Sequence, residues 1–246
     1  MNRFMKNIQR QYKQIVSDLK NRADKSRAKR DSFYHKKGGY VSWGVSTTDF
    51  RLIMKKFRKQ FIELKNKEAL DLAWLFYKSG IEDQIYVGNF ITALHSEAIT
   101  SSNIKFFDKA LDYFHTWGTI DDFCVHTLET LLRKFPKQTT EILRKWNKSK
   151  NMWKRRASVV AFTRKTGESG KFTNEALKLC DNLISDKEDL VQKGVGWALK
   201  DVMRGNKPKV LDYVKKLRKQ GVPSVITLYA LRDIKGLEKK QILAIK

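Results

Sequence analysis

Apolar residues recur at helical spacing along almost the whole of this 246-residue chain, and this periodicity restricts the possible folds more than any other feature. One amphipathic segment follows another, separated by short breaks that contain Gly, Asn, Ser or Lys, and no segment has the alternating pattern of a β-strand. Only three prolines interrupt the pattern. We therefore expect an all-α protein. The predicted helices cover residues 2–20, 48–64, 67–79, 82–99, 102–115, 119–134, 137–147, 151–165, 173–185, 188–204, 207–219, 223–234 and 236–245.

In the second half of the chain the predicted helices repeat in pairs. The pairs begin near Thr119, Asn151 and Lys187, about 32 to 36 residues apart. Each pair opens with a helix rich in small or apolar residues, and a more basic helix follows, as in EILRKWNK and VLDYVKKLRK. This spacing is typical of a helical-repeat solenoid, in which stacked pairs produce a concave surface. An irregular helical bundle is the alternative.

The chain is strongly basic, with 51 Lys and Arg against 26 Asp and Glu and a net charge of +25. The charge is uneven, because residues 1–60 carry +13, residues 61–130 carry −6 and residues 131–246 carry +18. Surface charge that serves only solubility has little reason to change sign along the chain. The pattern therefore favours a polyanionic partner such as nucleic acid. Solubility alone remains the simpler alternative. Residues 21–43, which include RADKSRAKR, are the least regular stretch and are predicted to be a flexible basic segment that orders on a partner.

Several classes of protein are disfavoured by the sequence. No apolar run approaches the roughly 20 residues of a membrane span, and no segment has the lopsided apolar face of a membrane-surface helix, so no membrane partner is expected. The two cysteines, Cys124 and Cys180, cannot form a disulfide framework. We expect them to be free buried thiols in a reducing compartment, the cytoplasm. The histidines and cysteines lack the spacings of metal ligands, and no phosphate-binding glycine motif occurs, so neither a metal nor a cofactor is expected.

Three stretches of the second half carry a resemblance to a known family. They are TWGTIDDF at 116–123, NMWKRRASV at 151–159 and QKGVGWALKD at 192–201. In this order and at these separations they resemble the DNA alkylation repair family of HEAT-like-repeat glycosylases, the AlkD type. SWGVSTTDFR at 42–51 is a weaker match, and the resemblance spans about residues 40–235. It implies a single HEAT-like helical-repeat domain over the whole chain, with a concave basic face.

The resemblance also implies an activity. Members of the family are alkylpurine DNA glycosylases, which hydrolyse the N-glycosidic bond of cationic N3- or N7-alkylated purines in duplex DNA and leave an abasic site, without base flipping. The implied partner is alkylated double-stranded DNA, bound by a monomer. Matched residue by residue, the catalytic carboxylate is Asp121, the two aromatic contacts are Trp117 and Trp197, and the phosphate-binding arginine is Arg156. The alternative is a non-catalytic helical-repeat protein that binds nucleic acid; a protein-binding scaffold is disfavoured by the +18 charge of residues 131–246.

The chemistry of Asp121 agrees with this resemblance. Asp121 lies four residues after Trp117, a spacing that places carboxylate and indole on one face if the chain is helical through Gly118. An N3- or N7-alkylated purine is already cationic and departs without being protonated, so one carboxylate can stabilise the charge that develops on the sugar and orient the attacking water. The alternatives are an aspartate that complements a helix dipole and a tryptophan that belongs to the core.

Trp197 has neighbours that suit a DNA-contacting surface. Gly194 and Gly196 remove side chains from its helix, and Lys193 and Lys200 lie four residues before and three residues after it, on the same face. An indole flanked by ammonium groups suits a surface that contacts sugar and cationic base while the lysines hold phosphates. A core position is the alternative for this residue too.

The second matching stretch, at 151–159, contains a basic turn. Arg156 follows Trp153 by three residues, and its planar guanidinium suits phosphate oxygens. Arg155 and Lys154 are expected to assist it in binding DNA. A solvated basic turn at the start of a helix is the alternative.

Overall fold

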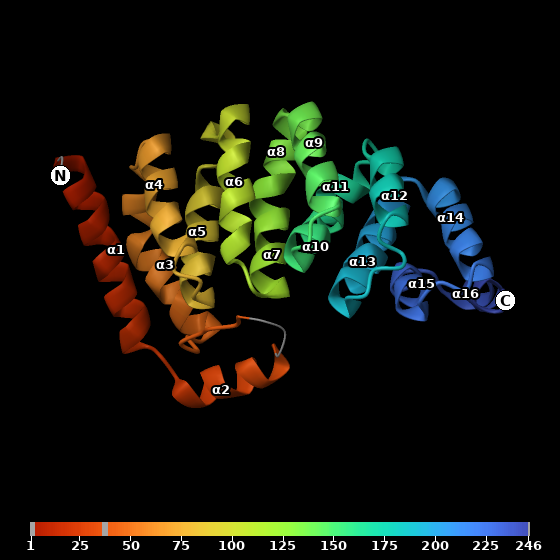
Figure 1. The fold of residues 1–246 in the computed structure, drawn as a ribbon, viewed down its shortest axis with the longest axis horizontal. Helices are drawn as coiled ribbons and strands as arrows, with labels where there is room; N and C mark the ends of the chain where they lie inside the picture. The colour runs from red at the N-terminus through yellow and green to blue at the C-terminus, as the bar shows by residue number, and fades with distance from the viewer. Residues whose placement is uncertain (1–2, 36–38, 246) are drawn as a thin grey trace. The chain divides into compact units, whose positions relative to one another are not determined.

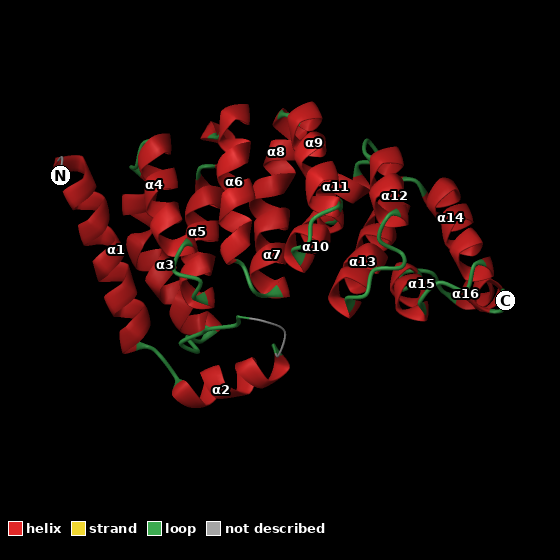
Figure 2. Ribbon diagram, in the orientation of Figure 1, coloured by secondary structure: helices red, strands yellow, loops and turns green. Residues whose placement is uncertain are grey.

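The structure is a computed structural model that describes residues 3–35 and 39–245. Within these residues it consists of helices joined by loops and contains no strand (Figures 1 and 2). The predicted all-α class is therefore confirmed, and helices that follow one another in the chain pack together, as in a helical repeat. The chain forms two compact units, Met1–Thr127 and Leu128–Lys246, and each is described by itself. The single domain and the concave basic face stay predictions.

The first unit is built around α5. Its helices are α1 (Arg3–Asn21), α2 (Lys25–Tyr34), α3 (Thr47–Ile62), α4 (Asn66–Tyr77), α5 (Glu82–Leu94), α6 (Ile104–Ala110) and α7 (Trp117–Phe123), with short 3-10 turns on either side of α6. α5 packs against α3, α4 and α7, and α4 also packs against α1. In Figure 1, α2 runs across one end of the other helices of this unit. The interior is rich in aromatic rings from α3 to α7.

Polar side chains define where several of these helices begin. Asp24, Ser46 and Thr116 each accept a hydrogen bond from a backbone N–H in the first turn of the helix that follows, which satisfies donors that otherwise lack a partner. The Asp24 cap starts α2 inside the stretch 21–43, which the sequence predicts to be irregular. Residues 36–38 lie outside the described residues, and ordering of this stretch by a partner stays a prediction.

The loop after α2 is tied to both α2 and α5. The carboxylate of Asp83, which is buried on α5, accepts hydrogen bonds from the Ser42 hydroxyl at 2.8 Å and from the Trp43 N–H at 2.6 Å. Trp43 in turn accepts the N–H of Asp24 at 2.9 Å. Gly44 has a φ of +74°, and a Cβ atom there would overlap the Asp24 carbonyl oxygen. These contacts fix the start of α2 against the start of α5.

The second unit is built around its longest helix, α13. The helices are α8 (Glu129–Lys134), α9 (Pro136–Asn147), α10 (Met152–Val160), α11 (Arg164–Glu168), α12 (Thr173–Asp181), α13 (Asp189–Gly205), α14 (Lys207–Lys219), α15 (Ser224–Ala230) and α16 (Gly236–Leu243). α13 packs against α10, α11, α12, α14 and α15. A π-helical turn, Cys124–Leu128, connects α7 to α8.

The remaining sequence predictions concern cysteines, membranes and metals. Cys124 and Cys180 are buried and form no disulfide, which confirms their predicted burial. No helix in the described part of the chain is both long enough and apolar enough to cross a membrane. Among the described residues, no group of three or more His, Cys, Asp and Glu side chains could hold a metal ion.

Candidate active site

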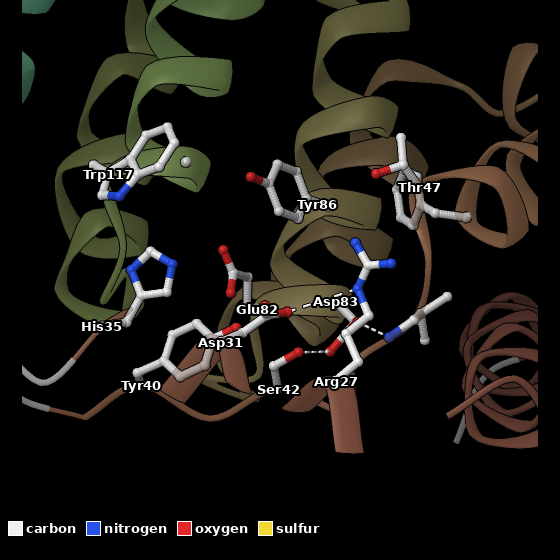
Figure 3. A pocket seen from close by; sticks show the side chains of 13 residues that line it. Arg27, Asp31, His35, Tyr40, Ser42, Thr47, Glu82, Asp83, Tyr86 and Trp117 are labelled. Atoms are coloured by element: carbon white, nitrogen blue, oxygen red, sulfur yellow. Dashed lines mark hydrogen bonds and ion pairs between the residues drawn. The ribbon is translucent and has the colours of Figure 1, made fainter. Parts of the chain in front are cut away.

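A pocket of about 370 Å³ lies within the first unit, at the start of α7. Its walls come from α2, from the loop that follows it, from the first turn of α3, and from α5 and α7. In Figure 3, Trp117 and His35 lie on one side of this space, with Tyr86 and Glu82 opposite them. The lining residues are Arg27, Asp31, His35, Tyr40, Ser42, Val45, Thr47, Phe50, Glu82, Asp83, Tyr86, Trp117 and Gly118.

Trp117 is the first residue of α7 and borders the pocket. Its side chain is 46% exposed, which excludes the alternative that it is a core residue. The His35 ring is tilted by 38° relative to the indole, with centroids 6.0 Å apart, and His35 stacks on Tyr40 at 4.7 Å. The contact with His35 restricts the orientation of the indole, while nearly half of Trp117 stays accessible to a ligand.

Asp121 lies one helical turn after Trp117. α7 is helical from Trp117 to Phe123, so the condition for placing the Asp121 carboxylate and the Trp117 indole on one face is met. Asp121 is partly exposed, and its charge is one of those that raise the pKa of Tyr86 on α5, after the larger effect of burial. The carboxylate of the neighbouring Asp122 accepts a hydrogen bond from the Asn89 side chain of α5 at 3.0 Å.

α5 supports the start of α7 through three residues spaced at helical intervals. The Glu82 carboxylate accepts a hydrogen bond from the Thr116 hydroxyl at 2.9 Å. One turn later Tyr86 lies against Gly118, where a Cβ atom would overlap the tyrosine hydroxyl oxygen. A further turn on, Asn89 donates to the carbonyl oxygen of Thr119 at 2.9 Å. These contacts fix the rotation of α7 and hence the direction in which Asp121 projects.

The sequence does not predict this platform of Glu82, Tyr86 and Asn89. The signal for it is a polar stripe at positions i, i+4 and i+7 of a helix that is otherwise buried. In an isolated sequence such a stripe is typical of a solvent-facing side, so it does not distinguish a buried polar contact from an exposed face.

Burial dominates the electrostatics of the pocket. It raises the pKa of Glu82, although hydroxyl groups of Tyr40 and Thr116 that hydrogen-bond to the carboxylate act in the opposite direction. The two charged neighbours that affect Glu82, Asp83 and Asp31, are both carboxylates and raise its pKa further. Burial also lowers the pKa of His35, which favours the neutral imidazole.

Glu82→Gln is expected to remove a pH dependence of stability. A carboxyl whose pKa is raised by folding adds stability at pH values below its unfolded pKa and loses that contribution as the pH rises through the folded pKa. The free energy of unfolding of the wild type should therefore fall relative to that of Glu82→Gln as the pH rises from about 4, the usual pKa of a free glutamate, towards neutral. Urea unfolding across this range measures the difference. Glu63→Gln, which changes an exposed carboxylate, is the control; if both variants track the wild type, Glu82 is not buried as described.

Trp197 lies near the middle of α13 in the second unit and is partly exposed. The guanidinium carbon of Arg164 lies 5.5 Å from the centre of its ring. Of the two flanking lysines, Lys193 is exposed and pairs with Asp189 at 3.4 Å. Lys200 is only 14% exposed and lies 3.1 Å from the buried carboxylate of Asp201. Lys193 is therefore the more accessible of the two predicted phosphate ligands.

The glycines beside Trp197 have a packing role. A Cβ atom on Gly196 would lie 2.6 Å from Cβ of Tyr229 and 2.8 Å from the carbonyl oxygen of Ile226, so the glycine permits α15 to approach α13. Gly194 faces Arg156 and Val160 of α10 at ordinary contact distances, 3.4 Å or more. The two glycines thus face other helices of the unit.

The basic turn on α10 is largely engaged within the second unit. Arg155 makes a two-pronged ion pair with Asp186, at 2.6 and 3.1 Å, and also donates to the carbonyl oxygens of Ser149 and Lys150. Arg156 is 5% exposed and donates to the carbonyl oxygen of Leu190. Lys154 is 8% exposed. In this structure Arg155 and Arg156 bind other parts of the second unit and Lys154 is buried, and contact of these three side chains with DNA stays a prediction.

Comparison with models of known protein families shows which family the chain belongs to. A family model described as "DNA alkylation repair enzyme" matches residues 15–234. The chain belongs to this family. The match includes all three stretches on which the sequence resemblance depends, and in the structure these lie on α7, α10 and α13. The AlkD type within the family stays a prediction.

A solved structure shows the same fold. A "Predicted DNA alkylation repair enzyme from Enterococcus faecalis" superposes with a TM-score of 0.71 and 14% identity, over 87% of this chain and 97% of that one. The Pseudomonas fluorescens alkylpurine DNA glycosylase AlkC, bound to DNA that contains an abasic site analog, has a TM-score of 0.47 and 14% identity, over 92% of this chain and 62% of that one. No curated protein sequence matches the chain.

Proposed function

We propose that this member of the DNA alkylation repair family is a DNA glycosylase of the AlkD type. It hydrolyses the N-glycosidic bond of cationic N3- or N7-alkylated purines in duplex DNA and leaves an abasic site. The observation that carries this proposal is the exposed Trp117 at the start of α7, with Asp121 one turn later on the same helix. A protein that only binds DNA has no need of a carboxylate there, since carboxylates repel phosphates.

The proposed reaction needs one protein carboxylate. The bond from the sugar C1′ to the purine nitrogen breaks, and its electron pair neutralises the cationic base. The Asp121 carboxylate stabilises the positive charge that develops on the sugar, orients a water molecule towards C1′ and takes its proton. Trp117 and Trp197 contribute electron-rich indole faces, which attract a charged lesion more than a neutral base.

The other side chains have supporting roles in this proposal. In this proposal Glu82 and Tyr86 hold Trp117 and Asp121 in position. The base reacts without being flipped into the pocket. Lys193 is an accessible phosphate ligand, and phosphate contacts by Arg156, Arg155, Lys154 and Lys200 are part of the same proposal. The protein acts as a monomer in the cytoplasm, on DNA, and uses no cofactor.

The deciding experiment is base release from a duplex that carries a single N7-methylguanine, with protein in excess. We expect wild type to release the base faster than the spontaneous reaction and to leave undamaged duplex intact. A duplex with N3-methyladenine tests the second lesion class. Binding of the same duplexes, measured in parallel, separates the alternatives: binding without release indicates a non-catalytic binding protein, and absence of both rejects the proposal.

A further inference from the structure

Arg164 occupies an unusual position between α10 and α11. With a φ of 52° it is, within the described residues, the one non-glycine residue in the left-handed region, where side chains crowd the backbone. Its backbone is held in place by the buried Asp201 of α13, which accepts the Arg164 N–H at 2.8 Å. Nearby, Gly167 packs so closely on α13 that a Cβ atom would lie 2.9 Å from backbone atoms of Asp201 and Val202.

The same face of α13 holds the side chain of Arg164. Trp197 precedes Asp201 by four residues, so indole and carboxylate project from one side of the helix. Asp201 binds the backbone of Arg164, and Trp197 lies under its guanidinium at 5.5 Å. The left-handed conformation therefore directs an exposed cation onto the indole face that the proposed function assigns to the lesion.

The carboxylates near Arg164 are bound by other basic residues. Glu168, four residues later on α11, is the normal helical partner for Arg164, but it pairs with Arg204 at 2.8 Å. Arg204 also pairs with Asp233 at 2.6 Å and lies 3.4 Å from Asp201. Within the described part of the chain, the guanidinium of Arg164 thus rests on an aromatic ring, and its N–H donors remain available to an anion.

We propose that Arg164 is a phosphate-binding residue that covers Trp197 in the free protein and moves onto the DNA backbone in the complex. A cation–π contact at an exposed site is weak, whereas a guanidinium binds two phosphate oxygens at once through charge-assisted hydrogen bonds. The exchange uncovers the Trp197 indole when DNA arrives. The choice of DNA as the ligand rests on the proposed function.

The test uses Arg164→Gly, because glycine adopts the left-handed conformation without strain and so keeps the backbone in place. Binding of undamaged duplex is measured over a series of salt concentrations. We expect the slope of log affinity against log salt to fall by about one and the affinity to fall roughly five-fold. Arg164→Lys, which keeps the charge but not the planar fork, should give an intermediate loss.

The control is Lys165→Ala, which removes the exposed positive charge of the next residue. The proposal fails if Arg164→Gly has the salt slope of the wild type, or if Lys165→Ala weakens binding as much as Arg164→Gly does. If the wild type releases base normally and Arg164→Gly binds like the wild type, only this inference is lost. If the wild type binds no duplex, the proposed function is lost.

A second measurement tests the cover over Trp197 without DNA. The emission of Trp197 is obtained as the difference between a protein and its Trp197→Phe counterpart, for wild type and for Arg164→Gly. We expect acrylamide to quench Trp197 more strongly when Arg164 is absent. Equal quenching contradicts the covering contact, and stronger quenching without any change in DNA binding reduces Arg164 to a structural role.

Discussion

Asp121→Asn is expected to slow base release from N7-methylguanine duplex by about 10²- to 10³-fold while the protein keeps its fold and its affinity for DNA. Asparagine has the shape of aspartate but carries no charge, so it stabilises the sugar cation poorly and accepts no proton from water. Asp121 is partly exposed, and asparagine keeps its size and one of its two acceptor oxygens, so the substitution changes the packing of α7 little. Single-turnover rates at saturating protein measure the effect on the chemical step.

Asp122→Asn is the matched control for this prediction. It changes the next carboxylate on the same helix, which projects about 100° away and already accepts a hydrogen bond from Asn89 at 3.0 Å. We expect its rate of base release to stay within about ten-fold of the wild type, because one displaced contact shifts α7 only slightly. If Asp121→Asn is as fast as wild type, the assignment of Asp121 is wrong; if Asp122→Asn is the slower variant, the catalytic group is Asp122.

The helices could be predicted because their signals are local. Apolar spacing, glycine stops and capping residues act over a few positions, so α9, α13 and α14 begin and end within a residue or two of their predicted bounds. The predicted helix 151–165 is instead divided, since α10 ends at Val160 and α11 starts at Arg164. Arginine has no preference for a left-handed backbone, so the break depends on the contact with Asp201, 37 residues away.

The candidate site was predictable to the extent that it is local. Trp117 and Asp121 are four residues apart on one helix, and a helical pattern is sufficient to bring them together. Glu82 reaches Thr116 across 34 residues, a contact that depends on how α5 packs against α7. A single sequence contains no sign of that packing.

The basic residues show a different limit. Arg155, Arg156 and Lys193 each carry one positive charge and lie within four residues of a tryptophan in the sequence. In the structure Arg155 is engaged by Asp186, Arg156 is buried, and Lys193 is exposed. Whether a cation faces solvent depends on how the tertiary structure packs around it, so composition and spacing predict a basic surface without saying which residues form it.

Asp201→Ala is expected to have the largest effect on stability, a decrease of about 3–5 kcal/mol in the free energy of unfolding. Asp201 is fully buried on α13 and accepts the backbone N–H of Arg164. Its other oxygen makes no well-directed hydrogen bond but lies 3.1 Å from the Lys200 ammonium and 3.4 Å from the Arg204 guanidinium, which it neutralises. Without Asp201, the ammonium of Lys200, which is only 14% exposed, lacks its counter-charge.

Urea unfolding of two further variants tests whether the uncompensated charge is the cause. Asp212→Ala removes a 77% exposed aspartate from α14, whose partner Lys215 is 3.5 Å away, and should change stability by less than about 0.5 kcal/mol. Asp201→Leu combined with Lys200→Met should be more stable than Asp201→Ala, because two apolar side chains replace the buried pair and no charge remains unpaired. If the double variant is no more stable than the single one, the stability depends on the Arg164 backbone contact. In that case Asp201 acts mainly to hold Arg164 over Trp197.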